Sequence, residues 1–403
     1  MKLHVFGQMS LASRALDEVQ PGSRDLTRST DRRFNDKGSG QDSGENTSRL
    51  RLGPPTIIDV ARDAGLSRST ASRALSGSTA VSAEARSRAE AAARRLGYTP
   101  NALARSMIRG SSEVIGVLVP DVATPYFARA VRGIADVARS AGFEVLLANT
   151  DGDPEVEARA LQVLTERRSD GIIVAPAIVA NAAHLARAID AGTPLVQLDR
   201  RVANLSGASS VTIDNAESSC VATRHLLQLN HRTIAVISES AQEIEWLLGR
   251  QRIPRQGLMP SAARLAGYLR ALREKGVMPD RELIVHSEYT RDAAVTATKD
   301  LLERRPDVTA ILCTDGVLTS GAFEALQRSG RICPRDISLV GFDDQEWMTM
   351  VRPELTVVAQ PDYQLGWAAA QELLNCLIHG RPPRDVRFRA SLVVRNSTAA
   401  HPT

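Results

Sequence analysis

The sequence of 403 residues contains only four cysteines, and they are scattered. None belongs to a CxxC pair and none has a histidine nearby at zinc-binding spacing; they are Cys220, Cys313, Cys333 and Cys376. Disulfide-stabilised secreted domains and structural zinc sites both depend on clustered cysteines. We therefore expect ordinary buried thiols, with neither a disulfide framework nor a structural metal.

Long apolar runs are also absent. The longest stretches, at residues 114–120 and 171–176, are strand-sized, whereas a membrane-spanning helix needs about 18 to 20 apolar residues. The N-terminal stretch has no sustained apolar segment followed by a small-residue cleavage pattern, so we do not interpret it as a secretory signal. These absences predict a cytoplasmic protein without a membrane span.

The sequence lacks the common catalytic and nucleotide-binding motifs. It contains no GxGxxG, GxxxxGK[ST], GxSxG or HExxH, and its seven histidines are dispersed. An enzyme is still one competing function, because doubly wound sheets host many reactions. A secreted sugar-binding protein is a second, but it would need an export signal. We predict neither an enzyme nor a bound cofactor.

The chain has enough residues for more than one domain, and its charge is unevenly spread. A single core stops growing near about 250 to 300 residues, and 43% apolar with 24% charged residues is typical of a globular protein. Residues 49–109 hold eleven arginines, no lysine and four acidic residues, a net charge of +7, whereas the whole chain carries +4. Such a basic segment favours binding to a phosphate backbone, although charge alone would also fit a solvated face.

The sequence divides into four parts. Residues 1–53 are rich in Ser, Asp, Arg and Gly without apolar periodicity, which predicts a disordered extension; a wrongly assigned start codon would look the same. Residues 54–100 are predicted to form a helix-turn-helix domain, and residues 101–110 a short connecting helix, for which the family resemblance described below implies the role of a hinge. The core at 111–403 has lobe one at about 113–215 and 360–390, and lobe two at about 216–359 and 391–403.

The core alternates apolar strand runs with amphipathic helices. The runs are VIGVLVP, FEVLLAN, GIIVAP, PLVQLD, SVTID, TIAVIS, LIVHS, AILCTD and SLVGFDD. Such alternation predicts parallel sheets with helices on both faces, and about nine or ten strands indicate two sheets. Because ligands of open parallel sheets bind at the carboxyl ends of the strands, we searched those ends for polar and aromatic side chains.

The segment TIIDVARDAGLSRSTASRALSG predicts two helices joined by a tight turn. Thr56 can cap the first helix, with Asp59 completing a capping box, and Gly65 provides the turn. Ser67 can cap the second helix, and a third helix follows a Ser82 cap. Arg68, Ser69 and Arg73 then point outward, where side chains of a recognition helix reach base edges. A three-helix bundle without any DNA target is the alternative.

From about residue 55 to 395 the chain resembles the lactose- and purine-repressor-type (LacI family) regulators. The similar positions are Asp59-Val60-Ala61, Ala64-Gly65-Leu66-Ser67, Thr70, Ser72-Arg73, Val81-Ser82, Gly97-Tyr98 and Pro100-Asn101-Ala102. The resemblance implies a three-helix headpiece, a hinge helix and an α/β core of two doubly wound parallel-sheet lobes like those of periplasmic sugar-binding proteins. It also implies a homodimer on a pseudo-palindromic double-stranded operator. The implied DNA contacts are Thr56, Ser67, Arg68, Ser69, Thr70, Arg73, Asn101, Ala104 and Met107.

The stretch PNALARSMIRG resembles the hinge helix of that family, which enters the minor groove as a pair. Met107 stands where the family usually has Leu, and Met is an accepted wedge between base steps. A helix this short is marginal alone, because stable isolated helices need about 12 to 15 residues. We expect it to order with DNA and a partner hinge. A linker helix packed on the core is the alternative.

The resemblance also implies an effector site in the core. Its main elements are Pro125-Tyr126-Phe127, the arginine of Arg264-Leu265-Ala266-Gly267-Tyr268, and Asp343 in Gly341-Phe342-Asp343-Asp344. Weaker candidates are Asp199, Tyr289, Thr314, where the family often has Asn, and Trp347. Each alone would also fit a strand-end cap or a core aromatic. Together, two acceptors, one forked donor and several aromatics suit a sugar or polyol.

One segment departs from the family pattern. The stretch around residues 241–260 is roughly a dozen residues longer than usual, and Pro260 stands where a polar contact is common. We expect this insertion to border the cleft, so the effector cannot be inherited from a relative. The sequence leaves open whether the effector releases DNA or acts as a co-repressor. It also leaves open whether the core senses any effector.

Overall fold

The computed structural model describes residues 54–78, 80–99, 110–180, 182–241, 243–250, 257–382 and 384–402. The predicted extension at 1–53 lies outside these ranges, as does the hinge segment except Gly110. The predicted hinge contacts Asn101, Ala104 and Met107 are therefore outside the described residues. So are residues 251–256 of the insertion.

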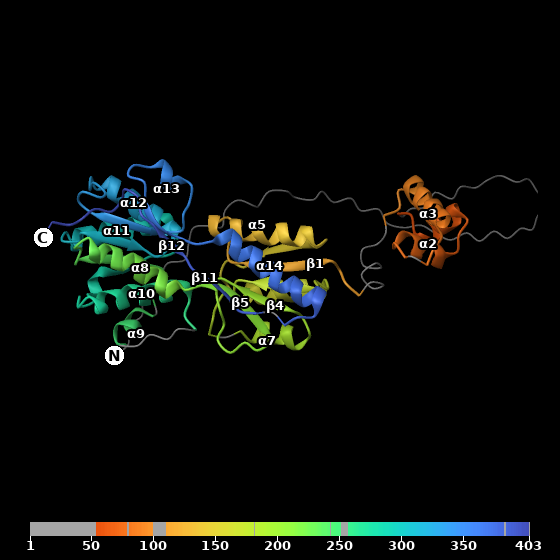
Figure 1. Cartoon of the computed structure of the whole chain (residues 1–403), viewed down its shortest axis with the longest axis horizontal. Helices are drawn as coiled ribbons and strands as arrows, with labels where there is room; N and C mark the ends of the chain where they lie inside the picture. The colour runs from red at the N-terminus through yellow and green to blue at the C-terminus, as the bar shows by residue number, and fades with distance from the viewer. Residues whose placement is uncertain are drawn as a thin grey trace, which may run out of the picture. The chain divides into compact units, whose positions relative to one another are not determined.

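The N-terminal unit consists of three short helices, α1 (Ile57–Ala64), α2 (Arg68–Leu75) and α3 (Ala83–Leu96) (Figure 1). The carboxylate of Asp59 accepts hydrogen bonds from the backbone and hydroxyl of Thr56 at 3.0 and 2.7 Å, which fixes the start of α1. Gly65 ends α1 in the left-handed conformation at φ 59°, a conformation that costs glycine little. The core is built from small side chains, among them Val60, Ala71, Ala89 and Ala92.

Lobe one contains a parallel sheet in the order β11-β5-β4-β3-β1-β2. Its strands are β1 (Val114–Val119), β2 (Glu144–Asn149), β3 (Gly171–Val174), β4 (Leu195–Leu198), β5 (Ala208–Ile213) and β11 (Val386–Phe388). The helices around it are α5 (Pro125–Ser140), α6 (Pro154–Glu166), α7 (Ala183–Asp190) and α14 (Asp362–His379). Helices α5 and α14 run side by side (Figure 1), and a side chain at Gly366 would collide with the carbonyl oxygen of Ala130.

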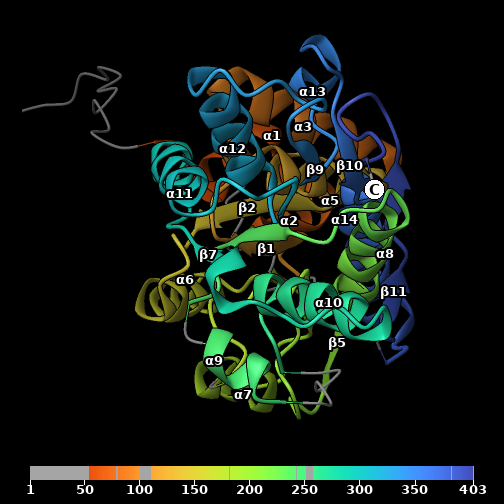
Figure 2. The ribbon, with the colours of Figure 1, turned by 90° about the vertical axis from the view of Figure 1, so that its left-hand side faces the viewer.

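Lobe two contains a sheet in the order β12-β10-β9-β8-β6-β7. Its strands are β6 (Ile234–Ser238), β7 (Ile284–His286), β8 (Ala310–Cys313), β9 (Ser338–Phe342), β10 (Thr356–Ala359) and β12 (Ser391–Val393). The helices are α8 (Asn215–Gln228), α9 (Ile244–Leu248), α10 (Pro260–Glu274), α11 (Arg291–Arg304), α12 (Gly316–Arg328) and α13 (Trp347–Met350), with a 3₁₀ turn at Arg281–Leu283. Helices α8 and α10 pack against each other (Figure 2).

The predicted fold class is confirmed, with two differences in the sheets. The described residues contain twelve strands rather than nine or ten, since β10, β11 and β12 correspond to none of the predicted apolar runs. Strand β12 pairs antiparallel with β10, so the second sheet has one antiparallel edge. The chain passes between the lobes three times, from β5 to α8, from β10 to α14 and from β11 to β12.

The four cysteines are free thiols; three are buried and Cys376 is half-buried. Among the described residues, no helix has both the length and the apolar character needed to span a bilayer.

Candidate functional sites

The start of α2 is held by a network of hydroxyl groups. The Ser67 side chain accepts a hydrogen bond from the backbone N–H of Thr70 at 3.1 Å, as predicted for a helix cap. Its oxygen also lies 2.9 Å from the hydroxyl of Ser69 and 2.8 Å from that of Thr70. The Ser69 hydroxyl is therefore engaged at the cap, which leaves it less free to read a base than the sequence predicts.

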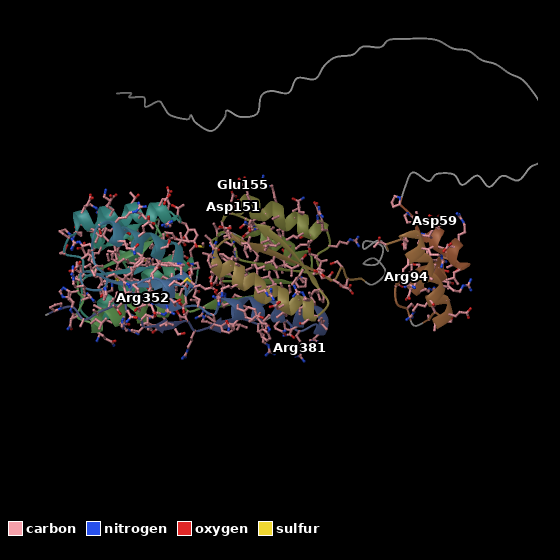
Figure 3. The ribbon with its side chains drawn as sticks, turned by 90° about the horizontal axis from the view of Figure 1, so that it is seen from above. Asp59, Arg94, Asp151, Glu155, Arg352 and Arg381 are labelled. Atoms are coloured by element: carbon pink, nitrogen blue, oxygen red, sulfur yellow. The ribbon has the colours of Figure 1, made fainter. Side chains whose placement is uncertain are left out.

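The arginines of α2 differ from those around them. Arg68 and Arg73 are exposed, and within the described residues their guanidinium groups have no ion-pair or hydrogen-bond partner. By contrast, Arg95 pairs with Asp63 at 2.6 Å and Arg88 donates to the carbonyl of Ala64 at 2.6 Å. Other charged side chains, such as Arg94 on α3, lie at the surface of the same unit (Figure 3). The unpaired guanidinium groups of α2 are thus available to phosphates or guanine edges.

In lobe one, the end of β4 presents Asp199. Its carboxylate accepts a hydrogen bond from the Tyr126 hydroxyl at 3.0 Å and lies 3.6 Å from Nε of Arg200. Burial is the main cause, and the charge of Asp199 the second, that raises the pKa of Tyr126 well above its usual value. The phenol therefore stays protonated and donates its hydrogen bond. Phe127 packs edge-on against Tyr126 with ring centroids 5.0 Å apart, and it belongs to the buried core.

In lobe two, Asp343 follows β9 in the left-handed conformation, at φ 63°. Its carboxylate accepts hydrogen bonds from Nε2 of Gln360 at 2.6 Å and from the backbone of Gly316 at 3.3 Å. Burial raises its pKa, while the charge of Arg264 lowers it. The charge of Asp199 from lobe one also raises the pKa of Asp343, so carboxylates of both lobes act on one site.

Arg264 is almost fully buried, at 5% exposure, and part of its hydrogen-bonding capacity is used inside the protein. Its Nε donates to the side chain of Asn215 at 2.8 Å, and one terminal nitrogen donates to the Thr314 carbonyl at 2.7 Å. The guanidinium lies over the Phe342 ring, 4.0 Å from its centroid. The other terminal nitrogen has no hydrogen-bond partner among the described residues, which leaves its N–H groups for a ligand.

Asp315 was not predicted, and it lies at the centre of the lobe-two site. It caps α12 by accepting from the backbone of Val317 at 2.7 Å, and it accepts from the Tyr289 hydroxyl at 3.2 Å. Burial and the charges of Asp343 and Glu239 raise its pKa to about 8. Its carboxyl group therefore holds a proton to a higher pH than an exposed aspartate does.

Two predicted ligand residues have their side chains engaged elsewhere. The Thr314 hydroxyl donates to the carbonyl of Ile237 at 3.3 Å. Thr314 therefore contributes to the site through its backbone carbonyl, which accepts a hydrogen bond from Arg264. Trp347 lies on α13, where its ring packs 6.3 Å from Phe323 and its indole N–H donates to Gln345. Trp347 thus packs on the lobe-two core, and no described contact joins it to the strand-end carboxylates.

Sequence reasoning missed three polar residues at the same strand ends. Asp315 ends the AILCTD run, Glu239 follows β6, and Gln360 follows β10. The rule that ligands bind at carboxyl ends of parallel strands could have found Asp315 and Glu239. It could not have found Gln360, because β10 was not among the predicted runs. Gln360 also lines a cavity of about 290 Å³ at the lobe crossings, together with Arg129, Asp344, Ala359, Pro361, Asp362, Gln364, Arg389 and Ser391.

The described part of the insertion includes a short helix that packs on lobe two. Leu247 of α9 is buried, and Arg273 of α10 donates to the carbonyls of Leu247 and Leu248 at 3.3 and 3.0 Å. Further along, a β-carbon built on Gly257 would lie 3.8 Å from that of Ala203 in lobe one. Pro260 is the first residue of α10, a position where its missing N–H costs nothing.

Comparison with known proteins extends over the three-helix unit and the core. Residues 56–101 match the family described as "Bacterial regulatory proteins, lacI family", and residues 112–395 match "Periplasmic binding proteins and sugar binding domain of LacI family". The chain is 33% identical to the ribose operon repressor of Halalkalibacterium halodurans, across 85% of this chain and 97% of that protein.

Two solved structures are similar in fold and sequence. One is the transcriptional regulator CelR in complex with cellobiose, with a TM-score of 0.62, 28% identity and coverage of 85% of this chain and 99% of that one. The other is the lac repressor dimer bound to operator and the anti-inducer ONPF, with a TM-score of 0.70 and 25% identity. This likeness covers 86% of the present chain and 100% of the lac repressor chain.

Proposed function

Because the chain belongs to the LacI family of bacterial regulatory proteins, we propose that it is a transcriptional repressor controlled by a sugar or polyol. It binds operator DNA through α1–α3 and binds the effector at the facing strand ends of the two lobes. The observation that carries this proposal is the contrast among its arginines. Arg68 and Arg73 are exposed and unpaired on the recognition helix, whereas Arg264 is buried and aimed by Asn215 and Thr314.

The proposed DNA complex is a homodimer on a pseudo-palindromic operator. The structure of the lac repressor dimer on its operator supports this arrangement by similarity. Arg68 and Arg73 read base edges in the major groove, while Thr56, Ser67 and Thr70 hold the N-terminal ends of α1 and α2 against the phosphates. Ser69 contributes mainly through the cap. The hinge residues Asn101, Ala104 and Met107 enter the minor groove, with Met107 as the wedge.

In the proposed effector site, Asp199 and Asp343 accept hydrogen bonds from donors of the ligand. The free terminal nitrogen of Arg264 donates to an acceptor of the ligand. Tyr126 and Tyr289 provide ring faces, and Tyr289 is 41% exposed. The names of the relatives, a ribose operon repressor and a cellobiose-bound regulator, support a carbohydrate as the ligand class. Regulation requires the effector to bind two conformations with different affinity, and such couplings are typically about 1 to 3 kcal/mol.

An electrophoretic shift assay with the upstream DNA of the chain's own gene and its neighbours tests the DNA-binding half. We expect a salt-dependent complex that Arg73→Ala weakens by about 1 to 3 kcal/mol, while the thermal shift caused by a sugar is unchanged. Arg94→Ala, on the outer face of α3, is the matched control for the loss of one charge. Equal affinity of the Arg73 variant and the wild type would remove Arg73 from the readers.

A further inference from the structure

The carboxylate of Asp170 holds the segment through which the chain enters lobe one. Asp170 is half-buried and stands directly before β3. Its Oδ1 accepts hydrogen bonds from the backbone N–H and the hydroxyl of Ser112 at 2.7 and 2.9 Å. Its Oδ2 accepts from the backbone N–H of Glu113 at 2.9 Å and from the hydroxyl of Ser111. These four contacts, from one side chain to residues 111–113, form the Asp170 anchor.

The backbone of the same segment is fixed by the two strands that flank β1. The carbonyl of Glu113 accepts a hydrogen bond from the backbone N–H of Glu144 at 2.8 Å, and the carbonyl of Val114 accepts from that of Asp170 at 2.8 Å. Glu113 lies in the left-handed region at φ 56°, which is uncommon for a residue with a side chain. Such a conformation persists where the surrounding structure determines it. The direction of the chain before β1 is therefore set by contacts with the core.

The Asp170 anchor lies at the end of the lobe-one sheet that is remote from the proposed effector site. Asp170 and Val114 stand at the amino ends of β3 and β1, whereas Tyr126 and Asp199 follow the carboxyl ends of the parallel strands β1 and β4. In sequence, the anchored segment directly follows residues 101–110, the predicted hinge. The anchor therefore joins the core to the hinge and has no part in direct contact with the effector.

We propose that Asp170 is a positioning residue for operator recognition, because it fixes the direction in which the hinge leaves the core. This inference rests on the proposed function, since it concerns how the same regulator places its hinge in the minor groove. A helix as short as the hinge is marginal alone, because stable isolated helices need about 12 to 15 residues. A fixed attachment at one end reduces the entropy that the hinge loses when it orders on DNA.

A purely structural anchor is the competing explanation, because hydrogen bonds to a carboxylate stabilise the folded protein in either case. Asp153 provides the comparison. Its carboxylate also binds backbone, accepting from the N–H groups of Glu155 and Val156 at 2.7 and 3.2 Å at the start of α6. Asp153 lies in the same lobe, and its described hydrogen bonds fall within residues 150–157. The positioning role predicts that substitutions of Asp170 and Asp153 differ in operator binding, whereas the structural explanation does not.

Titration of the full chain with DNA from upstream of its own gene tests the proposal, with the binding site defined by DNase I protection. Asp170→Ala should weaken this specific complex by about tenfold or more, a factor that the loss of one charged hydrogen bond accounts for. Binding to a scrambled fragment of equal length at low salt should be unchanged, because it depends on phosphate charge. Asp153→Ala, the matched control, should leave both affinities unchanged.

Two further variants grade the effect. Asp170→Asn keeps an acceptor oxygen and should recover part of the specific affinity. Ser112→Ala removes one hydroxyl and keeps the carboxylate, so it should weaken the specific complex about two- to tenfold. If Asp170→Ala does not fold, Ser112→Ala carries the test. Hydrogen exchange of the backbone N–H groups of Ser112 and Glu113 should be faster in Asp170→Ala than in Asp153→Ala, which measures the anchor without DNA.

The remaining outcomes separate this inference from the proposed function. Equal affinity of the wild type, Asp170→Ala and Ser112→Ala for the specific site would overturn the positioning role and leave the regulator intact. An equal loss in Asp170→Ala and Asp153→Ala would also overturn it, in favour of a purely structural anchor. A wild-type chain that binds the upstream and scrambled fragments equally would overturn the proposed function, and the role of Asp170 in operator recognition with it.

Discussion

The two lobes share one architecture but differ in how they neutralise the polar groups at their strand ends. In lobe one, Asp199 has a phenol donor and a nearby guanidinium, Tyr126 and Arg200. In lobe two, burial raises the pKa of both Asp315 and Asp343, and the charge of Asp343 raises that of Asp315 further. Both sheets supply the same geometric platform, a row of carboxyl ends. The platform therefore fixes where a ligand binds, whereas the side chains on each row decide what is bound.

The largest difference between the lobes is expected on removal of Asp343. Asp343→Ala should lower effector affinity by about a hundredfold, because charged hydrogen bonds are worth about 1.5 to 3 kcal/mol each. Operator binding without effector should persist, since the headpiece keeps its own core. Calorimetry and an operator shift assay measure the two effects. An unaltered response to effector would exclude Asp343 from the site, and Asp343→Asn checks that the loss is not caused by a cavity.

The raised pKa of Asp315 should have a smaller effect, which is on the stability of the folded protein. The pKa of Asp315 lies at about 8 in the folded protein, whereas its ordinary value is 3.8. Between these values the folded state holds a proton that the unfolded chain has released, so stability falls as pH rises from about 4 to about 8. Thermal unfolding of the ligand-free protein at pH 5, 6, 7 and 8 should show this slope. Asp315→Asn should flatten it, and a parallel slope in the variant would contradict the assignment.

The smallest loss of effector affinity is expected for a substitution in lobe one. Tyr126→Phe removes one hydroxyl donor from Asp199 and keeps the ring that packs on Phe127. A single such hydrogen bond contributes about 0.5 to 1.5 kcal/mol, which corresponds to a two- to tenfold loss of effector affinity. Titration of both proteins with the same sugar measures it. A loss as large as that of Asp343→Ala would mean that the two lobes contribute equally.

The sequence predicted the positions of strand ends better than the neighbours of each strand. Asp199 and Asp343 were predicted from the resemblance to the LacI family, and each also stands at the end of an apolar run. Glu239 and Asp315 stand at equivalent strand ends but were not among the site residues that the resemblance implied, and no local pattern records that β6 and β8 lie side by side. The direction of the Thr314 hydroxyl, towards the carbonyl of Ile237, depends on the same pairing.

Aromatic residues were harder to place than charged ones. Tyr126 and Phe127 are adjacent in sequence on α5, yet the tyrosine hydroxyl meets Asp199 while the phenylalanine is part of the core. Both residues carry an aromatic ring at the start of the same helix, so the sequence pattern alone does not show which ring lies in the core. The capping residues of the headpiece, in contrast, were predicted from sequence, because a cap depends on residues two or three positions away.

The three crossings between the lobes have a consequence for synthesis of the protein. Lobe one needs α14 and β11, which lie more than 140 residues after its other strands, so it cannot be completed until nearly the whole chain has left the ribosome. The three-helix headpiece ends at Leu96 and uses only local contacts. A nascent molecule therefore completes the unit that reads DNA long before it completes the sensor that controls that unit.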